Sequence, residues 1–158
     1  MHHAPQEIRT FFITSVTNAR QPIFRAEKMA LLVFILDVMQ KHREVDHFLL
    51  HEFVVMPDHF HLIITPAEDV SLEKAGQYIK GGFSFRAKRE LSYKFSIWQE
   101  GFTNHRIRDE EDYAHHRKYI HENPVEARLV KKASDYPYSS AFPGASVDPV
   151  PPWLKPRS

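Results

Sequence analysis

The sequence contains no cysteine, and this absence limits the chemistry that the chain can perform. Without thiols there is neither a disulfide framework nor a thiolate metal site, so a metal must bind to imidazole, carboxylate, amide or carbonyl groups. Long apolar runs are also missing. The longest one, residues 29–39, is interrupted by Asp37 and has about half the length of a membrane-spanning helix. Because the first residues do not resemble a signal peptide either, we expect a soluble, cytoplasmic protein with no membrane partner.

The length and composition indicate one ordinary domain. A chain of 158 residues that is 42% hydrophobic and 13% aromatic can bury a single substantial core. Five of the eleven prolines lie at position 143 or later. We therefore expect a folded domain at residues 1–141 and a proline-rich, irregular tail at residues 142–158.

The formal net charge is only +1, but positive charge gathers in one stretch. Residues 74–108 contain eight Lys or Arg side chains against two acids, with aromatic residues between them. Such a mixture is expected where a protein follows a phosphate backbone and stacks on bases, although for this stretch alone a helix with a solvated basic face and aromatic core residues is the plainer explanation. The candidates for phosphate contacts in and near this stretch are Lys80, Arg86, Arg106, Arg108 and Lys118.

Hydrophobic periodicity and turn residues predict an α+β fold. We expect strands at 11–17, 48–55, 59–65 and 95–98, the last one extended as far as 107, and helices at 26–45, 71–92, 109–123 and 125–130. Pro124 is expected to end the third helix and start the fourth. The order of elements matches the ferredoxin-like split βαβ arrangement, an antiparallel sheet with helices packed on one face. Its first and third strands lie at the centre.

The third predicted strand carries two histidines, His59 and His61. Side chains alternate along a strand, so both imidazoles project from one face while Phe60 and Leu62 point into the opposite layer. Two neutral imidazoles held in this way can share a divalent cation. The pair alone is equally compatible with two hydrogen-bonded or solvent-facing histidines.

A second cluster follows on the third predicted helix. Tyr119 and Asn123 are four residues apart and face the same way, so a phenol and an amide oxygen are presented together. A phenol titrates at about 10, so it needs a nearby cation to act as a nucleophile at neutral pH. A metal, a tyrosine and a basic aromatic groove together suit the cleavage of single-stranded DNA through a covalent 5′-phosphotyrosine. A tyrosine packed against the sheet is the plainer explanation.

Neighbouring residues on the same helix offer alternatives. His115 shares the Tyr119 face and could move a proton or serve as a minor ligand. His121 points elsewhere and is predicted to lie at the surface. Tyr113 is a rival nucleophile, but the helix turns it away from Tyr119.

Five short motifs stand out along the chain. They are Met-Pro-Asp-His-Phe-His-Leu at 56–62, Trp-Gln-Glu-Gly-Phe at 98–102, Arg-Ile-Arg-Asp-Glu-Glu-Asp at 106–112, Tyr-Ile-His-Glu-Asn-Pro-Val at 119–125 and Tyr-Pro-Tyr-Ser-Ser at 136–140. The same motifs occur in this order in the REP-associated tyrosine transposases, and the chain resembles that family over residues 10–141. That family is similar to the single-tyrosine transposases of the HUH class, in which a bulky apolar residue separates two histidines.

The resemblance implies a role for each candidate residue. It implies His59 and His61 as metal ligands, Asn123 as a further ligand, Tyr119 as the nucleophile, and Mg²⁺ or Mn²⁺ as the ion. It also implies a palindromic REP hairpin with a short single-stranded foot as the DNA partner, and a monomer or a homodimer. In the family the tail helps to read the foot of the hairpin, which points to Tyr138, Ser139 and Ser140 as DNA contacts.

The chain departs from the family pattern at two positions. Tyr138 stands where Trp is common, which affects the bases that the tail reads. Arg128 stands where Gly is common, which affects the end of the helix. Neither change affects the residues considered above as metal ligands or as the nucleophile.

Two other functions fit the same residues. A domesticated relative could hold nucleic-acid hairpins without cutting them, although the presence of both histidines and the tyrosine argues against this. A metal-dependent hydrolase in which Tyr119 only orients water would leave free 5′-phosphate ends. The sequence does not define the DNA target, the metal, the oligomeric state or whether DNA is mobilised in the cell.

Overall fold

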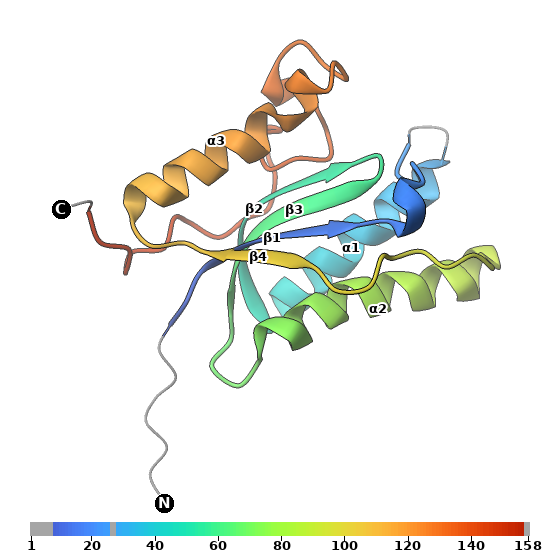
Figure 1. Cartoon of the computed structure of the whole chain (residues 1–158), viewed down its shortest axis with the longest axis horizontal. Coiled ribbons are helices and arrows are strands. Elements are labelled where there is room, and N and C mark those ends of the chain that lie inside the picture. Colours follow the sequence, from blue (N-terminus) through green and yellow to red (C-terminus); the bar gives the residue numbers. More distant parts are fainter. Residues whose placement is uncertain (1–7, 26–27, 157–158) are drawn as a thin grey trace, which may run out of the picture.

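The computed structural model describes residues 8–25 and 28–156 (Figure 1). The predicted start of the first helix, at residues 26 and 27, lies outside this part of the chain. The elements are β1 (Phe11–Val16), a 3-10 turn (Asn18–Arg20), α1 (Met29–Glu44), β2 (Phe48–Met56), β3 (His59–Pro66), α2 (Leu72–Leu91), β4 (Thr103–Arg106), α3 (Glu110–Glu126) and a second 3-10 turn (Ala133–Asp135).

The four strands form one antiparallel sheet in the order β2-β3-β1-β4. This is the strand order of the predicted split βαβ fold, with β1 and β3 at the centre. The Pro57-Asp58 turn joins β2 to β3 as a hairpin, so Val54 pairs with His61. On the other side of β3, Thr14 of β1 also pairs with His61. The prediction of a central strand beneath the two histidines is therefore confirmed.

The two faces of the sheet are covered by different helices (Figure 1). Helices α1 and α2 pack on the face that carries Ile13, Phe60 and Leu62, as predicted. Helix α3 lies against the opposite face, where Tyr113 and Ile120 pack on a second apolar cluster. The expectation of helices on one face therefore holds only for α1 and α2. None of the described helices is long and apolar enough to cross a membrane.

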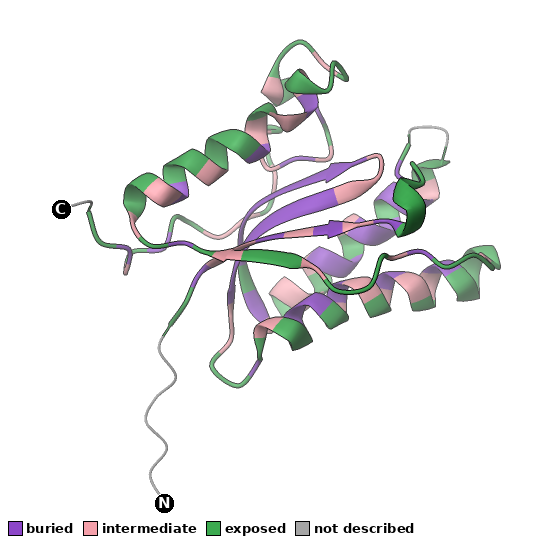
Figure 2. Ribbon diagram, in the orientation of Figure 1, coloured by how far each residue is buried: buried purple, intermediate pink, exposed green. Residues whose placement is uncertain are grey.

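This arrangement places two core layers around the sheet, in which β2 and β3 are buried and β4 is largely exposed (Figure 2). Burial alternates along β1, whereas β3 is buried on both faces from Phe60 to Thr65. Each fully buried Leu, Ile or Phe side chain contributes about 1.5–3 kcal/mol of transfer free energy. The sheet is therefore a rigid platform for the side chains that project from it.

Two predicted boundaries differ from the structure. The fourth strand is confined to Thr103–Arg106, and Trp98 forms only an isolated bridge with Thr17. Helix α3 continues through Pro124 to Glu126, so the separate helix predicted at 125–130 is wrong. Proline removes one backbone donor, and in the last turn this costs only the bond to the Ile120 carbonyl.

Arg128, one of the two departures from the family pattern, lies at the end of α3. Its backbone has φ 61°, in the left-handed region. The N–H of Arg128 donates to the Val125 carbonyl and the N–H of Leu129 donates to the Pro124 carbonyl, which is the pattern of a Schellman motif. Glycine adopts this conformation without the steric cost of a Cβ atom.

The chain after α3 returns along the outer edge of β2. Val55 donates its N–H to the Tyr138 carbonyl and Ser140 donates its N–H to the Phe53 carbonyl. Further on, Asp148 pairs with Arg43 of α1. The segment thereby covers hydrogen-bonding groups that an exposed edge strand would leave open.

Candidate active site

His59 and His61 are held on the α3 face of β3 by different partners. The Nδ1–H of His59 donates to Asp58 Oδ1 at 2.6 Å, and His61 Nδ1 is hydrogen-bonded to Thr14 Oγ1 at 2.7 Å. The ring centroids lie 4.7 Å apart. Because both Nδ1 atoms are occupied, each ring presents its Nε2 atom for another contact.

The electrostatic environment keeps His61 neutral. Its side chain is buried, and burial together with the nearby His59 lowers its pKa to about 3. Burial raises the pKa of Asp58, but the hydrogen bond from His59 and the charge of Arg20 outweigh this and lower it. A neutral imidazole is the form that binds a metal, and an ionised carboxylate beside the second imidazole increases its basicity.

Helix α3 brings Tyr119 to the same place. Its ring centroid is 5.2 Å from that of His61 and 6.1 Å from that of Phe12. The neighbouring Ile120 is fully buried against the sheet, which orients the helix. Tyr119 remains 50% exposed, so a large substrate can reach the phenol.

The predicted residues share one pocket of about 530 Å³. Its lining consists of Phe12, Thr14, Val16, Arg20, His59, His61, His115, His116, Tyr119 and Asn123. The two histidines, the tyrosine and the asparagine therefore come together within one chain. His115 also faces this pocket, as its spacing from Tyr119 predicted.

Two atoms of this pocket show that a cation would fit. His61 Nε2 and Asn123 Oδ1 are buried and have no hydrogen-bond partner. Buried polar atoms without partners are costly, so each one in a folded protein calls for an explanation. Imidazole nitrogen and amide oxygen are both ligands for divalent ions. The donor set thus matches a divalent cation.

A buried carboxylate, Glu52 of β2, fixes α3 beside this pocket. His121 Nε2–H donates to Glu52 Oε1 at 2.7 Å, and the Tyr113 hydroxyl donates to Oε2 at 3.2 Å. Ser140 Oγ of the returning segment also donates to Oε1, at 2.7 Å. Burial raises the pKa of Glu52, but the hydrogen bonds from His121 and Ser140 prevail and lower it.

This network corrects one prediction and supports another. His121 is half-buried and bonded to Glu52, so its predicted surface position is wrong. Tyr113 is buried, and burial with the nearby Glu52 charge raises its pKa, so it is turned away from Tyr119 as predicted. Thr14 and Glu52 were missed because their partners are 47 and 69 residues away in the sequence. Only Asp58, a partner of His59, could have been found from the sequence, because it is next to His59 in the predicted turn.

The predicted phosphate contacts occupy different surfaces. Lys80 and Arg86 lie on α2, across the sheet from Tyr119. Lys80 Nζ donates to the Gln99 and Gly101 carbonyls, and Arg86 pairs with Asp37 and Glu90. The structure does not bring these two side chains to the pocket.

The other predicted contacts lie on several different elements. Arg106 ends β4, Arg108 follows it, and Lys118 is exposed on α3 next to Tyr119. Tyr138, Ser139 and Ser140 line the edge of β2, where Ser139 is buried. Arg20 was missed, although it lines the pocket and its Nη1 lies 3.4 Å from Asp58 Oδ2.

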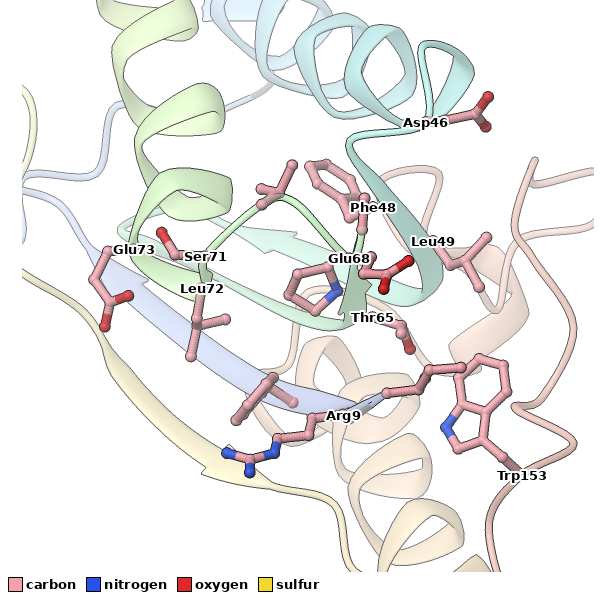
Figure 3. A pocket seen from close by; sticks show the side chains of 15 residues that line it. Arg9, Asp46, Phe48, Leu49, Thr65, Glu68, Ser71, Leu72, Glu73 and Trp153 are labelled. Atoms are coloured by element: carbon pink, nitrogen blue, oxygen red, sulfur yellow. The ribbon is translucent and has the colours of Figure 1, made fainter. Parts of the chain in front are cut away.

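A larger pocket, of about 620 Å³, lies at the opposite end of β3 (Figure 3). Its wall is largely apolar and includes Phe48, Leu72 and Trp153. Asp46, Glu68 and Glu73 stand around it with Arg9, and no histidine lines it. Although this pocket is larger than the one beside Tyr119, the acidic side chains around it disfavour a phosphate. It is therefore a poor candidate for the DNA site.

Comparisons with known proteins agree with this geometry. The family model described as "Transposase IS200 like" matches residues 10–123. The REP-associated tyrosine transposase of Escherichia coli K12 is 32% identical over 131 residues, which cover 82% of this chain and 74% of that protein. A putative REP-associated tyrosine transposase of Haemophilus influenzae is 35% identical over 96 residues, 54% of each chain.

Two solved structures share the fold of this chain. A REP-associated tyrosine transposase bound to a REP hairpin superposes with a TM-score of 0.68 at 27% identity, over 100% of this chain and 99% of that one. A putative transposase from Deinococcus radiodurans has a TM-score of 0.52 at 18% identity, over 78% and 97% of the two chains, and shows the fold alone.

The fold and the pocket thus define a transposase of the tyrosine type. The chain belongs to the IS200-like transposase family, as an enzyme of the REP-associated tyrosine transposase group.

Proposed function

We propose that this transposase is a metal-dependent endonuclease and strand transferase that cuts single-stranded DNA beside palindromic REP-type hairpins. The observation that carries the proposal is the approach of the Tyr119 ring to within 5.2 Å of the His61 ring in the same chain. This apposition lets a single subunit supply both the nucleophile and the metal ligands. The site is therefore of the HUH type, with Phe60 between the histidines.

His59, His61 and Asn123 would hold the metal, because their free nitrogens and amide oxygen face one pocket. Oxygen-rich DNA and the amide ligand favour Mg²⁺ or Mn²⁺. When bound, such a cation polarises the scissile phosphate and stabilises the leaving oxygen. Thr14 and Asp58 orient the two rings through their Nδ1 atoms.

Tyr119 supplies the covalent step. Its hydroxyl oxygen attacks the scissile phosphorus, so a new P–O bond forms to Tyr119 while the bond to the 3′ oxygen breaks. The phenol gives up one proton and the leaving 3′ oxygen takes one up. Both protons are exchanged with solvent at the open side of the pocket. The 5′-phosphotyrosine conserves the bond energy. A 3′ hydroxyl of another strand can therefore reverse the step without ATP.

The hairpin partner is proposed from the relative that was solved with a REP hairpin. Arg106 and Arg108 lie at and after the end of β4, and Lys118 lies on α3 next to Tyr119. We expect their charges to contact phosphates, which would make binding salt-dependent. Tyr138, Ser139 and Ser140 are expected to contact the foot of the hairpin.

A denaturing-gel assay with a labelled hairpin and Mn²⁺ tests the proposal. The wild-type protein is expected to form a covalent protein-DNA adduct, and Tyr119→Phe is expected to abolish the adduct while hairpin binding persists. Tyr93→Phe is the control, since this tyrosine packs with the α1 and α2 cluster on the other face of the sheet. Adduct formation should persist in this variant.

The alternatives give different products. A hairpin-binding module would bind the DNA without any adduct in the wild-type protein. A hydrolase that uses Tyr119 only to orient water would release free 5′-phosphate ends and leave no protein attached. An unchanged adduct yield in Tyr119→Phe would refute the assignment of the nucleophile.

A further inference from the structure

A cluster of three side chains outside the proposed catalytic metal site has the composition of a second metal site. His105 of β4 approaches Asp112 of α3 with Nε2 at 2.8 Å from Oδ2. His116, one helical turn after Asp112, places Nδ1 at 3.1 Å from Oδ1. All three potential ligand atoms lie within 4.8 Å of one another. None of these residues is required by the proposed cleavage step.

The distances agree with ligands around one ion. Zn²⁺ binds imidazole nitrogen and carboxylate oxygen at about 2.0–2.2 Å, so two ligands of a tetrahedral ion lie about 3.4 Å apart. The two nitrogen-oxygen separations, 2.8 and 3.1 Å, are slightly shorter than that. An ion at this place would replace the contacts that now join the three side chains, including the hydrogen bond from His116 Nδ1–H to the Asp112 carbonyl at 2.9 Å.

The backbone holds the carboxylate in position. The N–H of Arg108 donates to Asp112 Oδ2 at 2.9 Å, and the N–H of Asp112 itself is capped by the Asp109 side chain at 2.8 Å. His116 follows Asp112 by four residues on α3, so the helix places both side chains on one face. The ligands are thus preorganised by β4, a strand of the sheet, and by α3, which packs on the sheet.

We propose that His105, Asp112 and His116 bind a borderline divalent transition ion, with Zn²⁺ as the representative ion and solvent at the fourth position. Two imidazoles and one carboxylate, with no DNA phosphate to add oxygen ligands, suit such ions better than Mg²⁺, which prefers oxygen ligands. The side chains are 36%, 18% and 18% exposed, so the ion and its water have access.

The ion would clamp α3 to β4. The clamp lies on the opposite side of the helix from the Glu52 network, so both flanks of α3 would be tied to the sheet. The Phe12 ring stands between the two proposed metal sites, 5.2 Å from the His61 ring and 4.8 Å from the His116 ring. Zinc would then stabilise the helix that carries Tyr119.

Cobalt titration of the tag-free, chelator-treated full chain tests this inference. Co²⁺ serves as the probe because its visible absorption and calorimetric stoichiometry report each bound ion. The wild-type chain should bind two ions, and the variant with both His59→Ala and His61→Ala should bind one. Adding His116→Ala to that variant should remove the remaining ion. His105→Ala, on the other element, should do the same.

The control is His115→Ala in the same background, which should still bind one Co²⁺ because this neighbouring histidine is not among the three ligands. Zn²⁺ should raise the melting temperature of the His59→Ala/His61→Ala variant by a few degrees and leave the variants that also lack His105 or His116 unchanged. The inference is overturned if the double variant binds no ion, or if its ion survives both His105→Ala and His116→Ala. Neither result depends on DNA cleavage, so the proposed function is tested separately.

Discussion

Glu52 Oε1 lies 2.7 Å from His121 Nε2, which joins the middle of β2 to the second half of α3. The same carboxylate receives Ser140 from the returning segment and has Arg117 at 3.5 Å. Tyr119 lies between Arg117 and His121 in the sequence but on the other flank of the helix. The network therefore sets how α3 is rotated, and with it the direction of the phenol.

Replacing Glu52 by Gln should destabilise the fold and misplace Tyr119. The amide keeps the shape but loses the charge that His121 and Arg117 need, which should lower the free energy of unfolding by about 2–3 kcal/mol. Urea denaturation measures this loss. The yield of the DNA adduct should also fall, and Mn²⁺ affinity with it, because α3 carries both Tyr119 and Asn123. Glu122→Gln, an exposed neighbour on the same helix, is the control, and equal stability of the two variants would contradict the role of Glu52.

Removing the amide of Asn123 should weaken the proposed catalytic metal site. Asn123→Ala deletes a buried oxygen that has no other partner, so Mn²⁺ affinity should fall about tenfold, which equals about 1.4 kcal/mol. Calorimetry in a His105→Ala background measures Mn²⁺ binding at this site alone, because that substitution removes the second proposed metal site. Asn104→Ala, at an exposed position of β4, is the control. Unchanged affinity in Asn123→Ala would exclude its amide as a ligand.

The stability of the metal-free protein should depend on the protonation of His61. Its pKa is about 3 in the fold, because of burial and the nearby His59, against an ordinary value of 6.5. Below pH 6.5 His61 is protonated in the unfolded chain but stays neutral in the folded chain. The free energy of unfolding therefore decreases as the pH falls from 6.5 towards 3. The loss from His61 between pH 7 and pH 5 should be about 2 kcal/mol.

Comparison with His61→Gln isolates this contribution, since the other titrating groups are common to both proteins. Chemical denaturation over the same pH range should give a shallower decline for the variant. Parallel curves for the two proteins would show that His61 titrates normally in the fold.

Glycine at position 128 should stabilise the protein. Arg128 has φ 61° at the end of α3, and a Cβ atom in this conformation costs about 1 kcal/mol. Arg128→Gly should therefore raise the melting temperature by about 2–4 °C in a chain of this size. Arg128→Ala removes the same charge but keeps the Cβ atom, and it should melt like the wild type. Equal melting of the Gly and Ala variants would contradict the steric explanation.

The local features of the site were predictable because they depend on short-range geometry. Alternation along a strand places His59 and His61 on one face in any sheet, and helical periodicity aligns Tyr119 with Asn123. The order of elements also restricts the topology to the observed strand order. The continuation of α3 through Pro124 was not predictable in the same way, because the packing of Ile120 on the sheet and the burial of Pro124 outweigh the loss of one hydrogen bond.

The sequence by itself determined which side chains share a face, since that follows from two fixed backbone periods. Only the tertiary structure decided that α3 crosses to the face opposite α1 and α2, where it meets the histidines. Its apolar stripe is sparse, with Tyr113, Ile120 and Pro124 as its buried members, so periodicity alone does not say which face of the sheet it covers. The choice depends on partners far away in the chain, above all Glu52, whose buried charge is satisfied only when α3 and the returning segment both lie against it.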